Sequence, residues 1–294
     1  MTDSVELILD AKSLHGEGPI WHAPSQRLYW VNISQGEVHV FDPRTGADRT
    51  IQVGQPVGTV VARRSGGLMV AVKRGFASLD LETEALTLVG DPALDLRENR
   101  FNDGKCDPAG RFWAGTMTEN SPTIHGAGSL YCLDVNHTVT RRLTGVSISN
   151  GLAWSQDKRT MYFIDSLAHS VDAFDYDDAT GAIGNRRVAI TIAADQGIPD
   201  GMTMDAEGML WVAQWGGSRV CRWDPADGRL LETIKVPASQ ASACAFGGPN
   251  LDELYITSAR IGLDEAALAG QPHAGGIFMV KPGVRGLEAF EYAG

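Results

Sequence analysis

A short hydrophobic pattern recurs six times along the chain. Each copy is four residues long and begins with a large apolar residue, and the second residue is aromatic in five of the six copies. The copies lie at residues 28–31, 68–71, 112–115, 161–164, 210–213 and 254–257. Their first residues are 40 to 49 positions apart, a period typical of the four-stranded blades of β-propellers. Each copy therefore predicts one strand of a repeating unit.

Two further segments accompany each copy. A small residue, often glycine, and a short apolar run precede it, as at residues 17–21, 103–106, 150–154 and 200–204. A third strand follows it and in five units ends on an apolar residue and an aspartate, as in Phe41-Asp42. No segment shows a helical apolar period over about twelve residues, and residues 263–269 predict two helical turns at most.

The repeats predict an all-β fold, a six-bladed β-propeller whose four-stranded antiparallel blades surround a central channel. Six units of about 49 residues account for the whole chain, so residues 1–294 are expected to form a single domain. We expect the strand at residues 5–9 to close the ring by pairing with the last unit, because an open ring would leave an unpaired edge. A β-sandwich is the alternative, but it predicts no sixfold repeat.

Composition excludes several classes of function. Hydrophobic residues make up 43% of the chain and the net charge is −11, so a nucleic-acid backbone is not the expected partner. No apolar run approaches the roughly 18–20 residues of a membrane span. The acidic N-terminus lacks the layout of a secretory signal, and the four cysteines contain no CxxC pair. We therefore expect a cytoplasmic protein without nucleic-acid or membrane partners.

Four polar residues occupy the same place in different repeats. Glu17, Asp103, Asn150 and Asp200 each precede a glycine, and the first strand of a blade lines the channel, so all four should face one point on the axis. Three close carboxylates repel each other unless a cation lies between them. Oxygen ligands favour calcium, magnesium or manganese, with zinc and iron also compatible. The alternative is ordinary turn chemistry, because Asp-Gly and Asn-Gly are common turn dipeptides.

A second polar cluster precedes Asp103. Arg100 and Asn102 should lie near the same end of the channel, where the planar guanidinium could neutralise the carboxylates or bind a substrate oxygen. The alternative is a surface ion pair between Arg100 and Glu98 or Asp95.

Two long loops are expected to surround the axial site. They run from Thr118 to Gly128, with Glu119 near the start, and from about Ile261 to Gly275. Long connections without their own structure are often functional. Trp215 ends another strand on this side, where it could stack on a sugar ring or pack between blades.

These motifs resemble those of the regucalcin (senescence marker protein 30) and gluconolactonase family. The resemblance is carried by residues 14–21, 100–105, 149–154, 199–202, 246–249 and 257–260 and so covers nearly the whole chain. That family consists of six-bladed propellers that act as metal-dependent sugar lactonases. The resemblance therefore implies the same fold and activity, with one divalent ion (Ca, Zn, Mn, Mg or Fe) as the cofactor.

The resemblance also implies roles for single residues. Glu17, Asn150 and Asp200 would be the metal ligands, and Asp103 would sit beside the metal and contribute to substrate binding. The residues expected to contact the sugar lactone are Arg100, Asn102 and Glu119.

The expected reaction is hydrolysis of an aldonolactone, a small-molecule sugar lactone, to its aldonic acid. The metal would act as a Lewis acid, and Asp200 would serve as general base as well as ligand. Hydroxide on the metal, with no separate base, is the alternative mechanism. Two other functions remain open, namely hydrolysis of other esters or organophosphates, which an apolar rim would favour, and calcium binding without catalysis.

Overall fold

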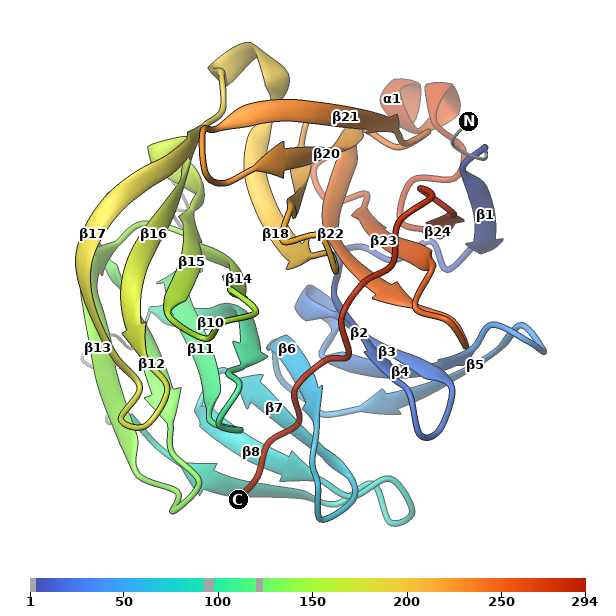
Figure 1. The fold of residues 1–294 in the computed structure, drawn as a ribbon. Helices are drawn as coiled ribbons and strands as arrows, with labels where there is room; N and C mark the ends of the chain where they lie inside the picture. The colour runs from blue at the N-terminus through green and yellow to red at the C-terminus, as the bar shows by residue number, and fades with distance from the viewer. Residues whose placement is uncertain (1–3, 93–97, 120–123) are drawn as a thin grey trace.

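The computed structural model describes residues 4–92, 98–119 and 124–294. In these ranges the chain forms antiparallel β-sheets that surround a common centre, like the blades of a propeller (Figure 1). Four of the sheets have four strands each, in sequence order. They are β2 (Gly16–His22), β3 (Arg27–Asn32), β4 (Glu37–Asp42), β5 (Ala47–Gln52); β6 (Val57–Ala62), β7 (Leu68–Val72), β8 (Gly75–Leu79), β9 (Leu86–Gly90); β10 (Asn99–Cys106), β11 (Phe112–Thr118), β12 (Gly128–Leu133), β13 (Val139–Val146); and β14 (Ser149–Trp154), β15 (Thr160–Asp165), β16 (Ser170–Asp177), β17 (Ala182–Thr191).

The fifth sheet has eight strands. Its members are β18 (Ile198–Met204), β19 (Leu210–Trp215), β20 (Arg219–Asp224), β21 (Arg229–Lys235), β22 (Gln240–Gly247), β23 (Glu253–Ala259), β24 (Ile277–Val280) and β1 (Glu6–Leu9). A single residue pair, Trp215 with Gln240, joins β18–β21 to the other four strands. The N-terminal strand β1 pairs with β24, with Glu6 opposite Met279. The expected pairing of residues 5–9 with the last unit is therefore confirmed.

The repeated hydrophobic pattern marks one strand in each group of four. All six copies lie in second strands, namely β3, β7, β11, β15, β19 and β23. Each of these strands lies inside its own sheet, with Trp30, Trp113 and Trp211 completely buried in the core. The indole Nε1 of Trp113 donates to Asp107 over 2.8 Å, and that of Trp211 donates to Asp205 over 2.9 Å, so the polar edge of each ring is satisfied within the core. The aromatic repeat is therefore inter-sheet packing.

Helical structure is confined to connections. The single α-helix of the described residues, α1 (Glu265–Gly270), begins at Asp264, whose side chain accepts from the Ala267 backbone N–H over 2.8 Å. The 3₁₀ turns are η1 (Ile33–Gln35), η2 (Ser166–Ala168) and η3 (Ala194–Gln196). The short helix agrees with the expected limit of two turns. No helix in the described ranges has the length and apolar character needed to cross a membrane.

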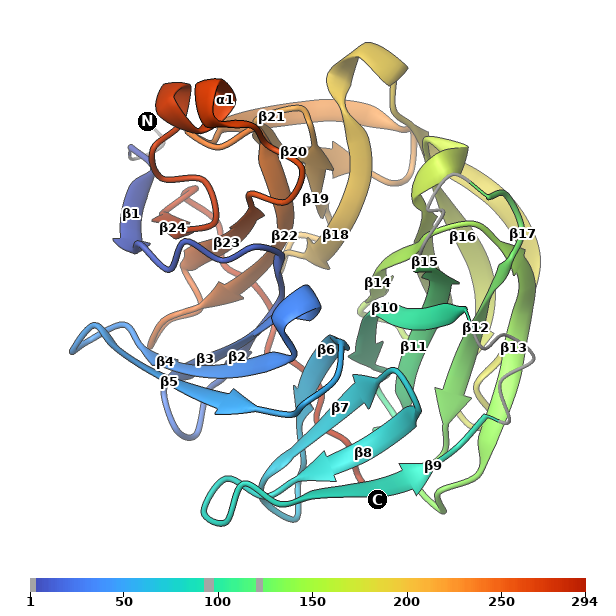
Figure 2. The same cartoon turned by 180° about the vertical axis from the view of Figure 1, so that it is seen from behind.

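The two ends of the ring are covered differently. The C-terminal segment after β24 crosses one end of the ring, in front in Figure 1. Its backbone forms isolated β-bridges there, between Tyr292 and Arg63 and between Gly286 and Asp205. The loop that carries α1 lies at the other end, toward the viewer in Figure 2. Gln240 Nε2 fixes this loop by donating to the Ile261 carbonyl over 3.0 Å. Of the other long loop, residues 120–123 lie outside the described residues.

Candidate metal centre and its cavity

The first strand of each group of four lies nearest the centre of the ring, and each of these innermost strands contains a β-bulge at an equivalent position. The pairing of each innermost strand with its neighbour shifts register once, for example between Ser149 and Leu152 in β14 and between Pro199 and Met202 in β18. Such a bulge bends a strand and re-aims its side chains. It brings Asn150 and Asp200 to the central axis from two different sheets. Their Asn-Gly and Asp-Gly pairs lie within strands, so the interpretation of these dipeptides as turns is wrong.

The glycines that follow allow neighbouring sheets to approach each other. A Cβ on Gly201 would lie 2.3 Å from the Cβ of Ala243, and one on Gly58 would lie 2.3 Å from the Asn102 carbonyl oxygen. Both distances are far below van der Waals contact, so no other residue fits without a backbone shift. Close packing of the innermost strands thus explains Gly104, Gly151 and Gly201, whereas Gly18 has a positive φ of 52° that favours glycine.

One cavity of about 470 Å³ contains most of the predicted site residues. The innermost strands contribute the side chains of Glu17, Arg100, Asn102, Asn150 and Asp200 to its lining. All five are less than a tenth exposed. The cavity therefore has a buried polar floor that several sheets build together.

The two carboxylates of the floor are unfavourably placed for ionisation. Burial raises the pKa of Glu17 to about 8, and the charge of Asp103 adds to this shift. Burial likewise raises the pKa of Asp200 well above its usual range, with Glu17 and Asp103 as further causes. Burial lowers the pKa of Arg100 to about 10, against the effect of the surrounding carboxylates. Two buried, mutually repelling carboxylates favour binding of a cation between them.

Asn150 is oriented by a chain of hydrogen bonds. The Ser166 hydroxyl donates to the Pro199 carbonyl over 2.7 Å and therefore accepts from the Asn150 Nδ2 over 2.8 Å. The amide nitrogen is thereby fixed on Ser166, which leaves Oδ1 as the group that Asn150 offers to the cavity, with Asn102 Nδ2 at 3.3 Å. Two carboxylates and one amide oxygen form a donor set that suits a divalent cation.

Asp103 lies apart from this set. It lines a much smaller cavity of about 10 Å³ together with Lys105, whose Nζ donates to the Met202 carbonyl over 2.6 Å. Burial raises the pKa of Asp103, and burial lowers the pKa of Lys105. Among the described residues, no group of three or more His, Cys, Asp or Glu side chains could hold a metal ion. The structure thus brings two of the three expected carboxylates into the central cavity, and not the third.

The strand register explains the position of Asp103. Phe101 pairs with Thr116 and Gly104 pairs with Ala114, so Asn102 is the first residue of the bulge in β10. Asn150 and Asp200 hold the same place in β14 and β18. Alignment on the following glycine is therefore one residue off in this repeat. Asp103 is the second residue of this bulge, and it lines the smaller cavity instead.

Arg100 and Glu119 are part of the cavity rather than of the outer surface. The Nη1 of Arg100 donates to Asn102 Oδ1 over 2.7 Å, and Asn102 Nδ2 donates to the Ser149 carbonyl over 2.9 Å. Arg100 is 8% exposed, so its interpretation as a surface ion pair is wrong; Asp95, one of the suggested partners, lies outside the described residues. Glu119 also lines the cavity and forms an ion pair with Lys73.

Sequence reasoning missed several lining residues. His15 lines the cavity, with its ring 5.7 Å from that of Trp215, and burial lowers its pKa to about 3, so it is neutral. Trp215 also lines the cavity, and stacking on a sugar ring stays a prediction. Ser166 gave no signal, because it follows a strand whose pattern predicts only packing. His15 stands two residues before Glu17, so the strand period alone could have placed it on the same side.

Comparison with known proteins identifies the family. A model of the SMP-30/Gluconolactonase/LRE-like region matches residues 15–260. The chain belongs to that family. The resemblance noted from the sequence motifs is therefore confirmed. Among curated members of the SMP-30/gluconolactonase family, regucalcin of Oryctolagus cuniculus is 44% identical over 294 residues, covering 99% of this chain and 98% of its own. Regucalcin of Homo sapiens is 42% identical with the same coverage.

Solved structures of this family share the whole fold. A luciferin-regenerating enzyme superposes with a TM-score of 0.93 at 34% identity, with both chains covered completely. A calcium-binding protein, regucalcin from Agrobacterium tumefaciens, superposes with a TM-score of 0.93 at 31% identity and covers 99% of this chain and 97% of its own.

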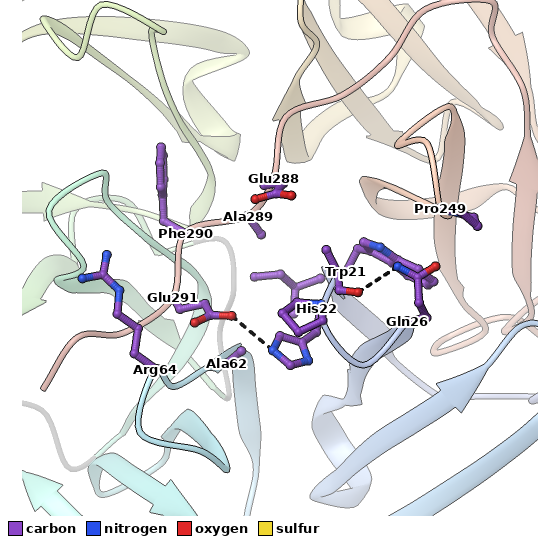
Figure 3. A pocket seen from close by; sticks show the side chains of 13 residues that line it. Trp21, His22, Gln26, Ala62, Arg64, Pro249, Glu288, Ala289, Phe290 and Glu291 are labelled. Atoms are coloured by element: carbon purple, nitrogen blue, oxygen red, sulfur yellow. Dashed lines mark hydrogen bonds and ion pairs between the residues drawn. The ribbon is translucent and has the colours of Figure 1, made fainter.

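A second, larger cavity lies at the opposite end of the ring. It measures about 650 Å³ and lies between the end of β2 and the C-terminal segment (Figure 3). In Figure 3 the side chain of Glu291 approaches His22, and the two are 3.1 Å apart. Glu17 is the second residue of β2 and His22 is its last, so the strand, at about 3.3 Å per residue, separates the two cavities. This family member therefore has charged cavities at both ends of the ring, and the predicted ligands line only one.

Proposed function

We propose that this protein is a metal-dependent lactonase that hydrolyses sugar aldonolactones to aldonic acids. The observation that carries the proposal is the pair of buried carboxylates, Glu17 and Asp200, in one cavity with the oriented amide of Asn150. Arg100 in the same cavity supplies a donor for a substrate oxygen. Membership of a family whose description includes gluconolactonase supports the reaction class.

The side chains of the floor suit a resident divalent ion. Glu17, Asn150 and Asp200 would hold it, and calcium, zinc, manganese, magnesium and iron are all compatible with such oxygen donors. Polarisation of the lactone carbonyl and easier ionisation of water are the chemistry that a divalent ion supplies. Removing either carboxylate would weaken binding of the ion and leave the other carboxylate with less compensating positive charge.

Asp200 is assigned the proton transfers. It takes a proton from the attacking water as the water oxygen bonds to the carbonyl carbon. The ring C–O bond then breaks, and Asp200 returns the proton to the released ring oxygen, which completes a hydroxy acid.

The remaining polar residues are assigned to substrate binding. Arg100 donates to the oxygen that gains charge during attack. Glu119 accepts hydrogen bonds from ring hydroxyls, and Asn102 adds a further amide contact to them, because each desolvated hydroxyl needs a partner. Asp103 acts from below the floor, through its charge, and does not touch the substrate.

We also propose that residues 1–294 form one domain with six blades. This count treats the eight-stranded sheet as two blades, which the single residue pair between its halves supports. We infer a cytoplasmic location from the cysteines, since all four described cysteines are buried free thiols.

Calcium binding without catalysis is the second candidate function. It is favoured by the description of the regucalcin from Agrobacterium tumefaciens as a calcium-binding protein. Both functions use the same donors, so metal binding alone does not separate them.

The deciding experiment is a panel of pentono- and hexonolactones assayed with each of the five metals. Acid release is measured against a no-enzyme control, because lactones also hydrolyse spontaneously. We expect turnover that a chelator abolishes and that re-added metal restores. Metal binding with no acid release above the control from any lactone would contradict the lactonase proposal and favour the calcium-binding function.

A further inference from the structure

The mouth of the central cavity differs in chemistry from its floor. Eight apolar side chains line the mouth, and they are Ile33, Pro56, Met117, Ile148, Leu167, Ile198, Trp215 and Ile261. Six of the eight are partly exposed, whereas Ile33 and Met117 are buried. The five polar residues of the floor are all buried. The cavity is thus polar where the innermost strands meet and apolar toward solvent.

These eight apolar residues come from all six groups of strands, and we call them together the apolar mouth. Each group of four strands contributes at least one member, from the end of a strand or from a connection beside it. Ile33 belongs to η1, Leu167 belongs to η2, and Ile261 directly precedes the α1 loop, at the end of the molecule that faces the viewer in Figure 2. The apolar mouth therefore surrounds anything that extends from the floor toward solvent.

Among the described residues, few polar partners lie in this part of the cavity. His15 and Ser34 lie beside the apolar mouth, but their side chains are 3.3 Å apart and bond to each other. Glu119 binds Lys73 through Oε2, which leaves Oε1 for the ring hydroxyls assigned to it above. Substrate hydroxyls directed at the floor meet Arg100, whereas a hydroxyl directed at the apolar mouth is desolvated without a partner, which disfavours binding. An apolar group at the same place gains from burial.

We propose that this cavity also hydrolyses lactones whose ring carries an alkyl substituent, and that the apolar mouth binds that substituent. The inference rests on the proposed lactonase activity and extends its substrate class. The lactone ring sits on the polar floor, water adds to the carbonyl carbon, and the ring C–O bond breaks to give a hydroxy acid with the same alkyl chain. A volume of about 470 Å³ leaves room for such a chain beside the ring.

The test is a series of lactones that share one reacting ring. The metal-loaded enzyme is assayed with δ-valerolactone, δ-hexanolactone, δ-octanolactone and δ-decanolactone, with spontaneous hydrolysis subtracted. Each buried methylene should raise kcat/KM by about two- to fourfold until the mouth is filled. A kcat/KM that stays flat or falls along the series overturns the proposal.

Variants connect the effect to the apolar mouth. Ile261→Gln and Leu167→Gln should each reduce the dependence of kcat/KM on chain length, and Ile261→Leu should restore it. The matched control is Val188→Gln, because Val188 is an apolar residue of the outer strand β17 that is 61% exposed and remote from the cavity. The control should keep the full dependence on chain length. Wild-type dependence in both mouth variants would overturn the assignment of the binding site.

The outcomes separate this inference from the proposal on which it rests. If sugar lactones are hydrolysed but the alkyl series is flat, the lactonase proposal stands and the inference fails. If no lactone of either kind is hydrolysed, both fail. A rising series that the mouth variants flatten and Val188→Gln preserves supports both.

Discussion

Charged side chains are buried at one end of strand β2 and partly exposed at the other. At the mouth end, Glu17 is 4% exposed and shares its cavity with a second carboxylate, Asp200. At the other end, Glu291 is paired with His22, and both side chains keep a fifth or more of their surface exposed. Burying like charges together destabilises a fold, whereas a solvated ion pair has little effect. The difference supports the proposed cation site at the Glu17 end of β2 and gives no such support at the His22 end.

The largest effect is expected from Asp200. Asp200→Ala removes the proposed base and one metal ligand, so kcat should fall by at least about 10³-fold in a lactonase assay at saturating metal. Asp195→Ala is the control, because Asp195 is an exposed acid in η3 just before β18. Full activity of Asp200→Ala would contradict its assignment.

The next effect concerns metal affinity and compares the two ends directly. Glu17→Gln keeps the shape of the side chain but removes its charge, so the dissociation constant of the divalent ion should rise at least about 100-fold in a calorimetric titration. Glu288→Gln makes the same kind of change in the second cavity and should leave the affinity unchanged. Equal losses in the two variants would show that the ends do not differ.

Arg100 should affect substrate binding more than chemistry. Arg100→Ala removes a charge-assisted hydrogen bond, so KM should rise by roughly 10- to 100-fold with a smaller change in kcat. Arg100→Lys retains the charge without the planar guanidinium, so its KM should lie between those of the wild type and Arg100→Ala. A large fall in kcat at unchanged KM would instead place Arg100 in the chemical step.

Much of the fold was predictable because packing repeats. Side chains of the second strands are buried in the core, so these strands are apolar in every group and carry an aromatic residue in five of six, and their spacing revealed the architecture. The ring closure was predictable because an unpaired last edge is unfavourable. The register was not predictable, because a bulge adds one residue without changing the apolar pattern. This is why Asp103 was grouped with Asn150 and Asp200, although Asn102 holds the equivalent place.

The site was predictable only in part, for a similar reason. Polar residues in equivalent repeats stand out against an apolar strand, so Glu17, Asn150 and Asp200 were visible in the sequence. The residues of the apolar mouth look like any other packing residues, and Ser166 looks like a loop serine. Their roles depend on where the loops between strands lie in the folded protein, which the local sequence pattern does not specify.

A smaller effect is expected on stability without metal. The pKa of Glu17 is raised from 4.5 to about 8, so the folded state binds more protons than the unfolded state between these values, and stability falls as pH rises through them. Glu17→Gln removes this contribution. In thermal unfolding with chelator, the Tm of the variant minus the Tm of the wild type should increase by several degrees from pH 5 to pH 8. Parallel pH profiles would contradict the unfavourable burial of Glu17.

The smallest effect is expected at the other end of β2. His22→Gln breaks the solvated pair with Glu291, so unfolding should become easier by less than about 1 kcal/mol and lactone turnover should not change. Chemical denaturation and the lactonase assay measure the two quantities. A tenfold loss of turnover would contradict this expectation and show that the end of the ring with His22 also contributes to function.

Anomalous diffraction from a crystal soaked in Mn²⁺ tests the central claim most directly. The account predicts one strong peak on the axis, within about 2.0 to 2.6 Å of an oxygen atom from each of Glu17, Asn150 and Asp200. A peak that contacts only one of these side chains, or one that lies only in the cavity beside His22 and Glu291, would contradict it.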